Sequence, residues 1–255
     1  MHPPLILADF IMHHIVDVDK FQLGSLTVTK HMVMLVLAAG LLLFLATLAA
    51  RGAGAVPRGR LTHAFEVIIL FLRDDVIGDK MSESDRRKFL PYAASVFFFI
   101  LFCNLIGLVP SWPGVYELGT ATGNINVTFG LAALTFFMIH GVALVKHGPI
   151  GYFSAVVPSV PWLLWPLLFV IEMAGFVAKA VALTVRLFAN MVGGHCVLLG
   201  VFSLMLAIPG SWVVFGGSTL LCIPITFLEI FVAFLQAYIF TFLTAIFVAE
   251  AAHGH

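Results

Sequence analysis

The chain has 255 residues, with 13 basic and 13 acidic residues, 61% hydrophobic residues, 10% charged residues and a mean hydropathy of +1.09. A soluble domain has about 25% charged residues, so the composition excludes that class and indicates a polytopic membrane protein with a lipid bilayer around it. The net charge of zero argues against a nucleic-acid partner.

The first part of the chain predicts an external segment, three spans and one surface helix. Residues 1–30 are expected to lie outside the membrane. Residues 31–50, 89–109 and 125–145 are apolar and long enough to cross it as helices. Residues 61–80 place apolar side chains at helical spacing opposite charged ones, which predicts an amphipathic helix on the membrane surface.

The last two apolar segments are too long for perpendicular spans. Residues 161–208 as one helix measure roughly 70 Å, against a hydrocarbon core of ~30 Å. Two alternatives remain: two short spans that meet near Lys179, or one long tilted helix. We favour one helix because no Gly or Pro lies between positions 176 and 192. With 218–249 it is expected to form a tilted hairpin.

These elements predict an all-α polytopic membrane protein with about five membrane-embedded helices, one surface helix and a single membrane domain over residues 1–255.

Eight of the 13 Lys and Arg residues lie between Arg51 and Lys88. The positive-inside rule therefore predicts that this loop is cytoplasmic. The N-terminus is then outside and the C-terminus is cytoplasmic.

Charged residues inside the last two segments are the main functional signal. Glu172, Lys179 and Arg186 are seven residues apart, so they share one helix face, and Asn190 lies near it. His195 points to the opposite side. An arginine near mid-membrane costs at least ~2.5–3.5 kcal/mol, so Arg186 is expected to have a function. Lys179 has a simpler explanation than a function, because its long side chain can place the ammonium at the membrane–water interface.

Four motifs carry a resemblance to a known family. They are "LTVRLFANMVGGH" (183–195), "FCNLIGLVP" (102–110), "NINVTFGLAAL" (124–134) and "LEIFVAFLQAYIFTFLTAIFVAEA" (228–251). The chain resembles subunit a of the bacterial-type F-type ATP synthase over about residues 60–251. The resemblance implies a stator proton-channel subunit in the cell (inner) membrane. Its partners would be the c-subunit ring, the peripheral-stalk b subunits and other ATP synthase subunits.

The resemblance also implies roles for particular residues, in a subunit that is not itself an enzyme and holds no cofactor or metal. Arg186 would drive proton release from ring carboxylates and block leak between two half-channels, with Gln236 facing it on the ring side. Family members place a carboxylate and an imidazole on the outer path; here the positions are exchanged, as His195 and Glu229. The expected proton-translocating residues are Arg186, Gln236, Asn190, His195 and Glu229, and the candidate lining residues are Glu172, Lys179, Asn104, Asn124, Asn126 and Thr128.

Two other classes of membrane protein would show sequence features that this chain lacks. A self-contained ion channel or secondary transporter is expected to have an internal repeat or matching broken helices, and the sequence has neither. An intramembrane metalloenzyme needs a ligand cluster such as H-E-x-x-H, and His140, His147 and His195 are dispersed.

Overall fold

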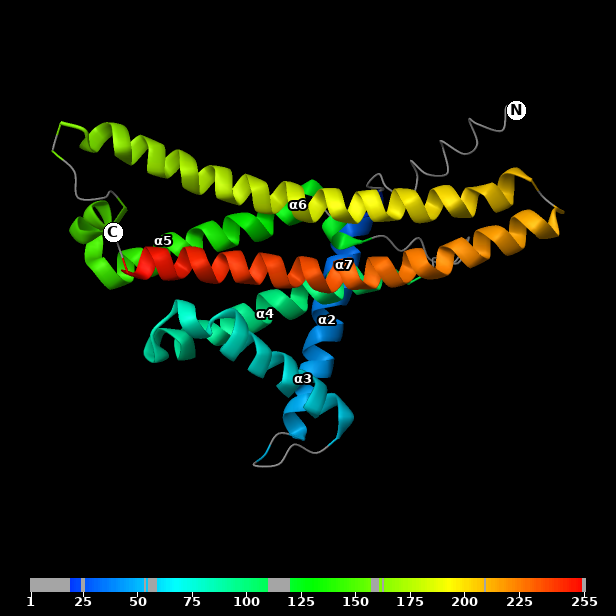
Figure 1. The fold of residues 1–255 in the computed structure, drawn as a ribbon, viewed down its shortest axis with the longest axis horizontal. Coiled ribbons are helices and arrows are strands. Elements are labelled where there is room, and N and C mark those ends of the chain that lie inside the picture. Colours follow the sequence, from blue (N-terminus) through cyan, green and yellow to red (C-terminus); the bar gives the residue numbers. More distant parts are fainter. Residues whose placement is uncertain are drawn as a thin grey trace. The chain divides into compact units, whose positions relative to one another are not determined.

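The computed structural model describes residues 19–23, 26–52, 54, 59–109, 120–156, 161, 163–208 and 210–253 (Figure 1). Most of the expected external segment, residues 1–18, lies outside the described residues. Within the described part, five helices are long and apolar enough to cross a membrane. These helices are α2 (Lys30–Arg51), α4 (Glu83–Gly107), α5 (Ile125–Val156), α6 (Trp165–Ala207) and α7 (Trp212–His253).

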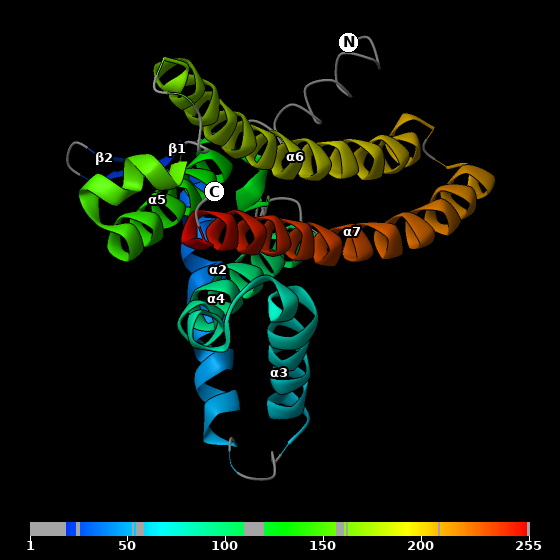
Figure 2. The same ribbon diagram turned by 60° about the vertical axis from the view of Figure 1, so that its left-hand side comes forward.

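The prediction of an all-α polytopic membrane protein is confirmed, with one small departure before α2. Strands β1 (Asp19–Leu23) and β2 (Leu26–Thr29) pair antiparallel, with Leu23 opposite Leu26 and Phe21 opposite Val28 (Figure 2). Alternating Thr and apolar residues in β2 suit a short strand. The hairpin falls in the part of the N-terminal segment for which the sequence predicted no structure.

Helix α4 begins six residues before the predicted span because its first turn is capped. The Ser82 Oγ accepts a hydrogen bond from the Asp85 backbone N–H at 3.3 Å and donates one to the Asp85 carboxylate at 2.9 Å. This arrangement satisfies an otherwise unpaired donor at the helix start. The charged residues 83–88 are therefore helical although they are not apolar.

The predicted surface helix 61–80 is present but is not regular along its length. Helix α3 (Arg60–Phe71) passes into a π-helical turn, η1 (Leu72–Val76), and then into a 3-10 turn, η2 (Gly78–Lys80). The wider π turn closes with the Ile77 N–H on the Leu72 carbonyl at 3.0 Å. It brings Ile77 onto the same buried side as Leu72 and Val76, which α-helical spacing would not do.

Helix α5 extends past the predicted span and bends at Gly148. This glycine has φ 71°, a left-handed conformation that suits a residue without a side chain. The chain doubles back there, because the Tyr152 hydroxyl lies 2.9 Å from His140 Nδ1, twelve residues earlier. Residues 149–156, which lie beyond the predicted span 125–145, are helical as well.

Helix α6 is a single helix of 43 residues through Lys179, so the alternative with a turn at that position is wrong. Helix α7 is also continuous over 42 residues, with Pro224 inside it. Each helix measures roughly 60 Å, whereas the hydrocarbon core is ~30 Å thick. Neither helix can therefore stand perpendicular to the membrane plane and lie within the core over its whole length.

The chain packs as two compact units, and each of the five long helices contributes to both. One unit comprises Met1–Leu42, Phe99–Val127 and Arg186–Gln236, and the other comprises Leu43–Phe98, Thr128–Val185 and Ala237–His255. In the first unit, Met34 and Ala38 of α2 pack against Cys103 and Ala121. In the second, the Tyr92 hydroxyl lies 3.3 Å from Thr135 Oγ1. The single membrane domain stays a prediction.

One glycine allows the end of α4 to pack closely against the residue that precedes η3 (Ala121–Gly123). A Cβ at Gly107 would lie 1.8 Å from Thr120 Cγ2 and 2.8 Å from Thr120 Cα. Both distances are far below van der Waals contact. No other residue type fits at position 107 without moving the Thr120 backbone.

We expect Gly107→Ala to lower the free energy of unfolding by about 1–3 kcal/mol, as overpacked substitutions do. The measurement is the thermal midpoint of the purified protein in mild detergent. Gly130→Ala is the matched control, because a Cβ there meets nothing within 4 Å; alanine should leave the midpoint equal or higher. Equal midpoints for the two variants would contradict the close approach.

Candidate functional site

One face of α6 presents Arg186 among small residues. Arg186, Ala189, Asn190, Gly193 and Val197 are exposed and recur at helical spacing, whereas Leu187 and Met191 are buried. Within the described residues Arg186 makes no hydrogen bond and no ion pair. The exposed face therefore carries a permanent cation that no described part of this chain neutralises.

Asn190 and Gln236 join α6 to α7. The Asn190 Nδ2 donates to the Gln236 Oε1 at 2.8 Å. The Gln236 side chain is only 1% exposed, and its Nε2 has no hydrogen-bond partner among the described residues. Gln236 is thus buried against α6 with one described partner, the Asn190 amide, and its place on the ring side of Arg186 stays a prediction.

Glu229 lies against the backbone of α6 one helical turn from Asn190. A Cβ at Gly194 would be 3.0 Å from the Glu229 Oε1, so the glycine makes room for the carboxyl group. Glu229 is 5% exposed, and neither carboxyl oxygen has a hydrogen-bond partner within the described chain. The His195 Nε2 is likewise buried and unpartnered there. Glu229 and His195 thus lie at the same level of the helix pair without a direct bond.

Asn104 and Asn124 have different roles in the structure. Asn104 is fully buried on α4, and its Oδ1 accepts a hydrogen bond from the Thr122 hydroxyl at 2.6 Å. Asn124 caps α5, since its Oδ1 accepts the Asn126 backbone N–H at 2.9 Å. Asn126 itself is exposed, and Thr128 is buried.

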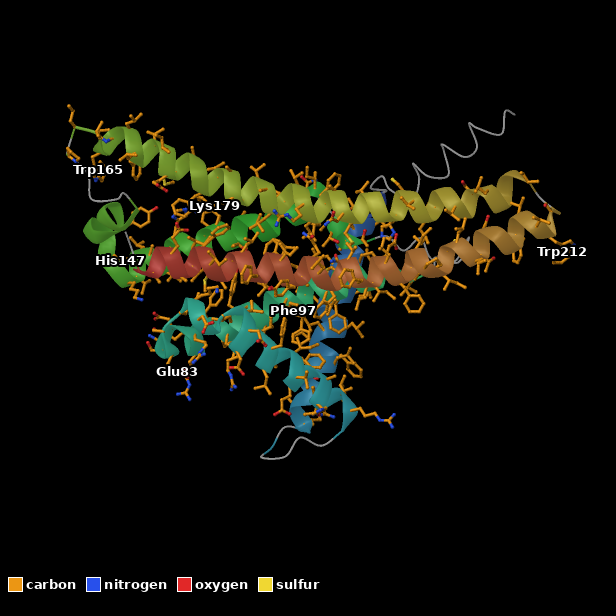
Figure 3. All side chains as sticks on the ribbon, viewed as in Figure 1. Glu83, Phe97, His147, Trp165, Lys179 and Trp212 are labelled. Carbon is orange, nitrogen blue, oxygen red and sulfur yellow. The ribbon has the colours of Figure 1, made fainter. Side chains whose placement is uncertain are left out.

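Lys179 is paired, unlike Arg186. Its Nζ donates to the Glu250 carboxylate at 3.1 Å near the end of α7. Glu172, two turns earlier on α6, is half-buried. Figure 3 marks Lys179 on α6. Glu172 and Lys179 therefore share a helix face, but only Lys179 has a hydrogen bond that the structure defines.

Sequence reasoning missed Glu250, Thr122 and Thr135 as partners of polar groups. Glu250 falls one residue beyond the predicted segment 218–249, and Thr122 lies between the predicted spans 89–109 and 125–145. Glu250 becomes a partner only through the contact of α7 with α6, and Thr122 only through the contact of η3 with α4. An antiparallel hairpin of 161–208 and 218–249 would have placed an acid of the last turns near Lys179, but the sequence does not define the register.

The described residues contain no group of three or more His, Cys, Asp or Glu side chains arranged to hold a metal ion. The polar groups above are instead spread along the helices, as single side chains or pairs.

A protein-family model described as "ATP synthase A chain" matches residues 32–249. Among curated relatives, ATP synthase subunit a of Anaeromyxobacter sp. (strain Fw109-5) is 42% identical over 236 residues, covering 91% of this chain and 56% of the relative. ATP synthase subunit a of Pelodictyon phaeoclathratiforme is 39% identical, covering 97% and 77%. ATP synthase subunit a 2 of Chlorobaculum tepidum is 38% identical, covering 96% and 73%. The chain spans only 56–63% of the length of the Anaeromyxobacter relatives.

The Asn190–Gln236 bond should be measurable as a coupling between the two side chains. In a double-mutant cycle of Asn190→Leu and Gln236→Leu, we expect a coupling of about 0.6 kcal/mol and at most ~1.7 kcal/mol in the free energy of unfolding. Reversible unfolding in mixed micelles measures it. Thr226→Val is the control, because the Thr226 hydroxyl bonds only to the Cys222 carbonyl of its own helix. The changes in the free energy of unfolding caused by Thr226→Val and Gln236→Leu should be additive in the double variant. If the changes caused by Asn190→Leu and Gln236→Leu are additive too, the Asn190–Gln236 bond is disproved.

Proposed function

Because this chain belongs to the ATP synthase A chain family, we propose that it is the stator subunit that carries protons through the membrane motor of an ATP synthase. The subunit would have no catalytic centre and no cofactor of its own. Its multi-pass membrane character agrees with its five long apolar helices.

The observation that carries the proposal is that Arg186 is an exposed cation with no carboxylate partner among the described residues. An arginine among apolar residues is costly unless a carboxylate approaches it. Arg186 has none in the described chain, and it stands on a face of small residues. Small residues allow a neighbouring helix to approach closely. These features support a ring of c subunits as the partner, each bringing one carboxylate past Arg186.

The proposed mechanism follows from the chemistry of guanidinium. A proton enters from outside through one half-channel and neutralises a ring carboxylate, which can then face lipid at low cost. After nearly a full turn, the carboxyl reaches Arg186. The permanent cation favours the ionised carboxylate, so the proton leaves through a second half-channel to the cytoplasm. The same charge repels protons and blocks a direct path between half-channels.

His195 and Glu229 are the proposed proton carriers of the outer half-channel. Their buried nitrogen and oxygen atoms have no partner among the described residues, and buried polar atoms generally need one. A proton or water in transit would supply it. Asn104 with Thr122, and the residues Asn124, Asn126 and Thr128, are proposed to line that path. Asn190 and Gln236 support the Arg186 region. Glu172 is proposed to line the inner half-channel. Lys179, paired with Glu250, is proposed to lie beside that path without carrying protons.

We further propose that the subunit lies in the cell inner membrane with its N-terminus outside and its C-terminus in the cytoplasm. The compact unit that contains the segments 43–98, 128–185 and 237–255 holds ten of the 13 Lys and Arg residues. Within that unit, Lys146 and Asp85 are 2.8 Å apart, which supports a common side for the bend of α5 at Gly148 and the start of α4. The positive-inside rule makes that side cytoplasmic.

The remaining partners are proposed from family membership alone. They are the peripheral-stalk b subunits, which would hold this chain against the rotating ring, and other subunits of the ATP synthase. The apolar side chains exposed along α2, α5 and α7 would face lipid or these helices. Nucleic acid is not an expected partner.

Arg186→Ala should abolish ATP synthesis driven by a proton gradient while the complex still assembles, because the partner of Arg186 is a moving carboxylate. Arg186→Lys should also fail, since an ammonium lacks the planar fork and can lose its proton when buried. Synthesis is measured in reconstituted vesicles with subunit content checked in parallel.

Arg73→Ala is the matched control, because Arg73 is exposed outside the spans and bonded to Asp74 at 2.7 Å. It should retain near-normal synthesis. Near-normal synthesis by Arg186→Ala would refute the mechanism, and loss of the assembled complex would instead indicate a structural arginine.

Exchanging the outer pair tests whether His195 and Glu229 act together. We expect His195→Ala and Glu229→Ala each to slow synthesis by roughly 10²-fold, the lower range for removing a positioned proton-transfer group. The double variant His195→Glu with Glu229→His should be faster than either, since one acid and one imidazole remain on the path. The assay is the same vesicle synthesis. A double variant no faster than the single ones would mean that the residues act separately.

A further inference from the structure

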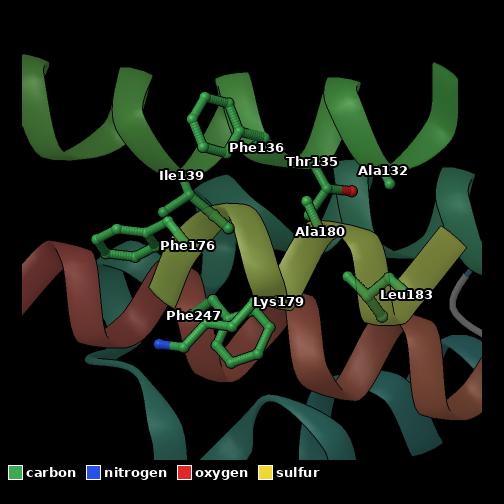
Figure 4. A pocket seen from close by; sticks show the side chains of 9 residues that line it. All are labelled: Ala132, Thr135, Phe136, Ile139, Phe176, Lys179, Ala180, Leu183 and Phe247. Atoms are coloured by element: carbon green, nitrogen blue, oxygen red, sulfur yellow. The ribbon is translucent and has the colours of Figure 1, made fainter. Parts of the chain in front are cut away.

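Lys179 lies in an aromatic clamp in the compact unit that contains residues 128–185 and 237–255. Its Nζ is 5.0 Å from the centroid of the Phe176 ring and 4.6 Å from that of Phe247. A small pocket borders it, and Thr135 is the other polar residue in a lining that is otherwise apolar (Figure 4). Ring faces attract cations, so the ammonium is held at a defined place rather than free to move.

Glu250 completes this arrangement from the last turns of α7. Its carboxylate is 3.1 Å from Lys179 Nζ, and both side chains are about one-third exposed. An ion pair against apolar walls is screened less than a pair in open water. Because the two charges are opposite and close together, they act on their surroundings mainly as a dipole. The field of a dipole falls faster with distance than that of a single charge.

Lys179 and Arg186 are the only Lys or Arg residues of α6, and they are seven residues, about two helical turns, apart on one helix. An unpaired Lys179 would be a second cation on the face that receives the ring carboxylate. It would compete with Arg186 for that carboxylate and would repel protons that leave toward the cytoplasm. Pairing removes both effects.

We propose that Glu250 is a positioning residue that neutralises Lys179, so that Arg186 is the single uncompensated cation of α6 at the proton-release step. This inference rests on the proposed function. Glu250 acts through Lys179 and needs no contact with the ring or with the proton itself. Its role is electrostatic, and the aromatic clamp keeps the lysine where the carboxylate can reach it.

The test uses the complete ATP synthase in reconstituted vesicles. Glu250→Gln should slow gradient-driven ATP synthesis roughly fivefold, at the lower end of couplings between sites. The decisive variant adds Lys179→Gln to it: once the orphaned cation is removed, synthesis should return most of the way to that of the unaltered complex. Glu83→Gln is the matched control, because it removes an acid from another ion pair, with Arg86, and should not change synthesis.

Other roles for Glu250 give different results. If Glu250 relays the proton or only holds the helix pair together, the double neutral variant will stay as slow as Glu250→Gln, and the proposal is overturned. Normal synthesis by Glu250→Gln overturns it as well. If the Glu250→Gln complex does not assemble, the test uses the charge exchange Lys179→Glu with Glu250→Lys. A reversed ion pair is also neutral overall, so this variant should synthesise ATP. An exchange variant that assembles but is inactive overturns the proposal.

The Arg186→Ala complex, assayed beside these variants, distinguishes failure of the role of Glu250 from failure of the proposed function. An inactive Arg186→Ala complex together with an unaffected Glu250→Gln complex refutes only the role of Glu250. An active Arg186→Ala complex refutes the proposed function itself, whatever the Glu250 variants do.

Discussion

The pairing of charge in apolar surroundings governs this structure. Lys146 is bonded to Asp85 and Lys179 to Glu250, so these cations are compensated within the chain. Arg186 is the contrast, because no described residue compensates it although it lies in the longest apolar helix. A permanent cation left in this way is costly to a membrane helix. In the proposed function, an approaching carboxylate of the c-subunit ring offsets this cost.

The support for Arg186 comes from the packing of α6 against α7. The Asn190–Gln236 bond joins the helices, with the Gln236 amide buried, and Gly194 lets the Glu229 carboxyl approach the α6 backbone. Ala233, fully buried one turn from Glu229, keeps the surface of α7 small at this level. A polar bond and small residues are the devices that hold membrane helices together, because lipid gives no hydrophobic drive for helix association.

The helices were predictable wherever hydrophobicity determined them. The spans 31–50 and 89–109 were recognised because twenty apolar residues have few alternatives in a bilayer. The boundaries were less predictable, because local hydrogen bonds determine them. Ser82 extends α4 into charged residues, and the left-handed Gly148 lets α5 continue after a bend. The π turn η1 arises from burying Ile77 with Leu72, a tertiary demand that the amphipathic pattern does not contain.

The sequence by itself determined the class of protein, the spans and the anomaly of Arg186, because hydropathy and the cost of a buried charge depend on residue type and spacing alone. It also placed Lys179 and Arg186 on one helix face, since helical periodicity is local. The tertiary structure alone decided which side chains meet: Gln236 with Asn190, Glu229 with Gly194, and Glu250 with Lys179. Those contacts depend on the register between α6 and α7. Register is set by packing over the whole helix pair, so no single motif encodes it.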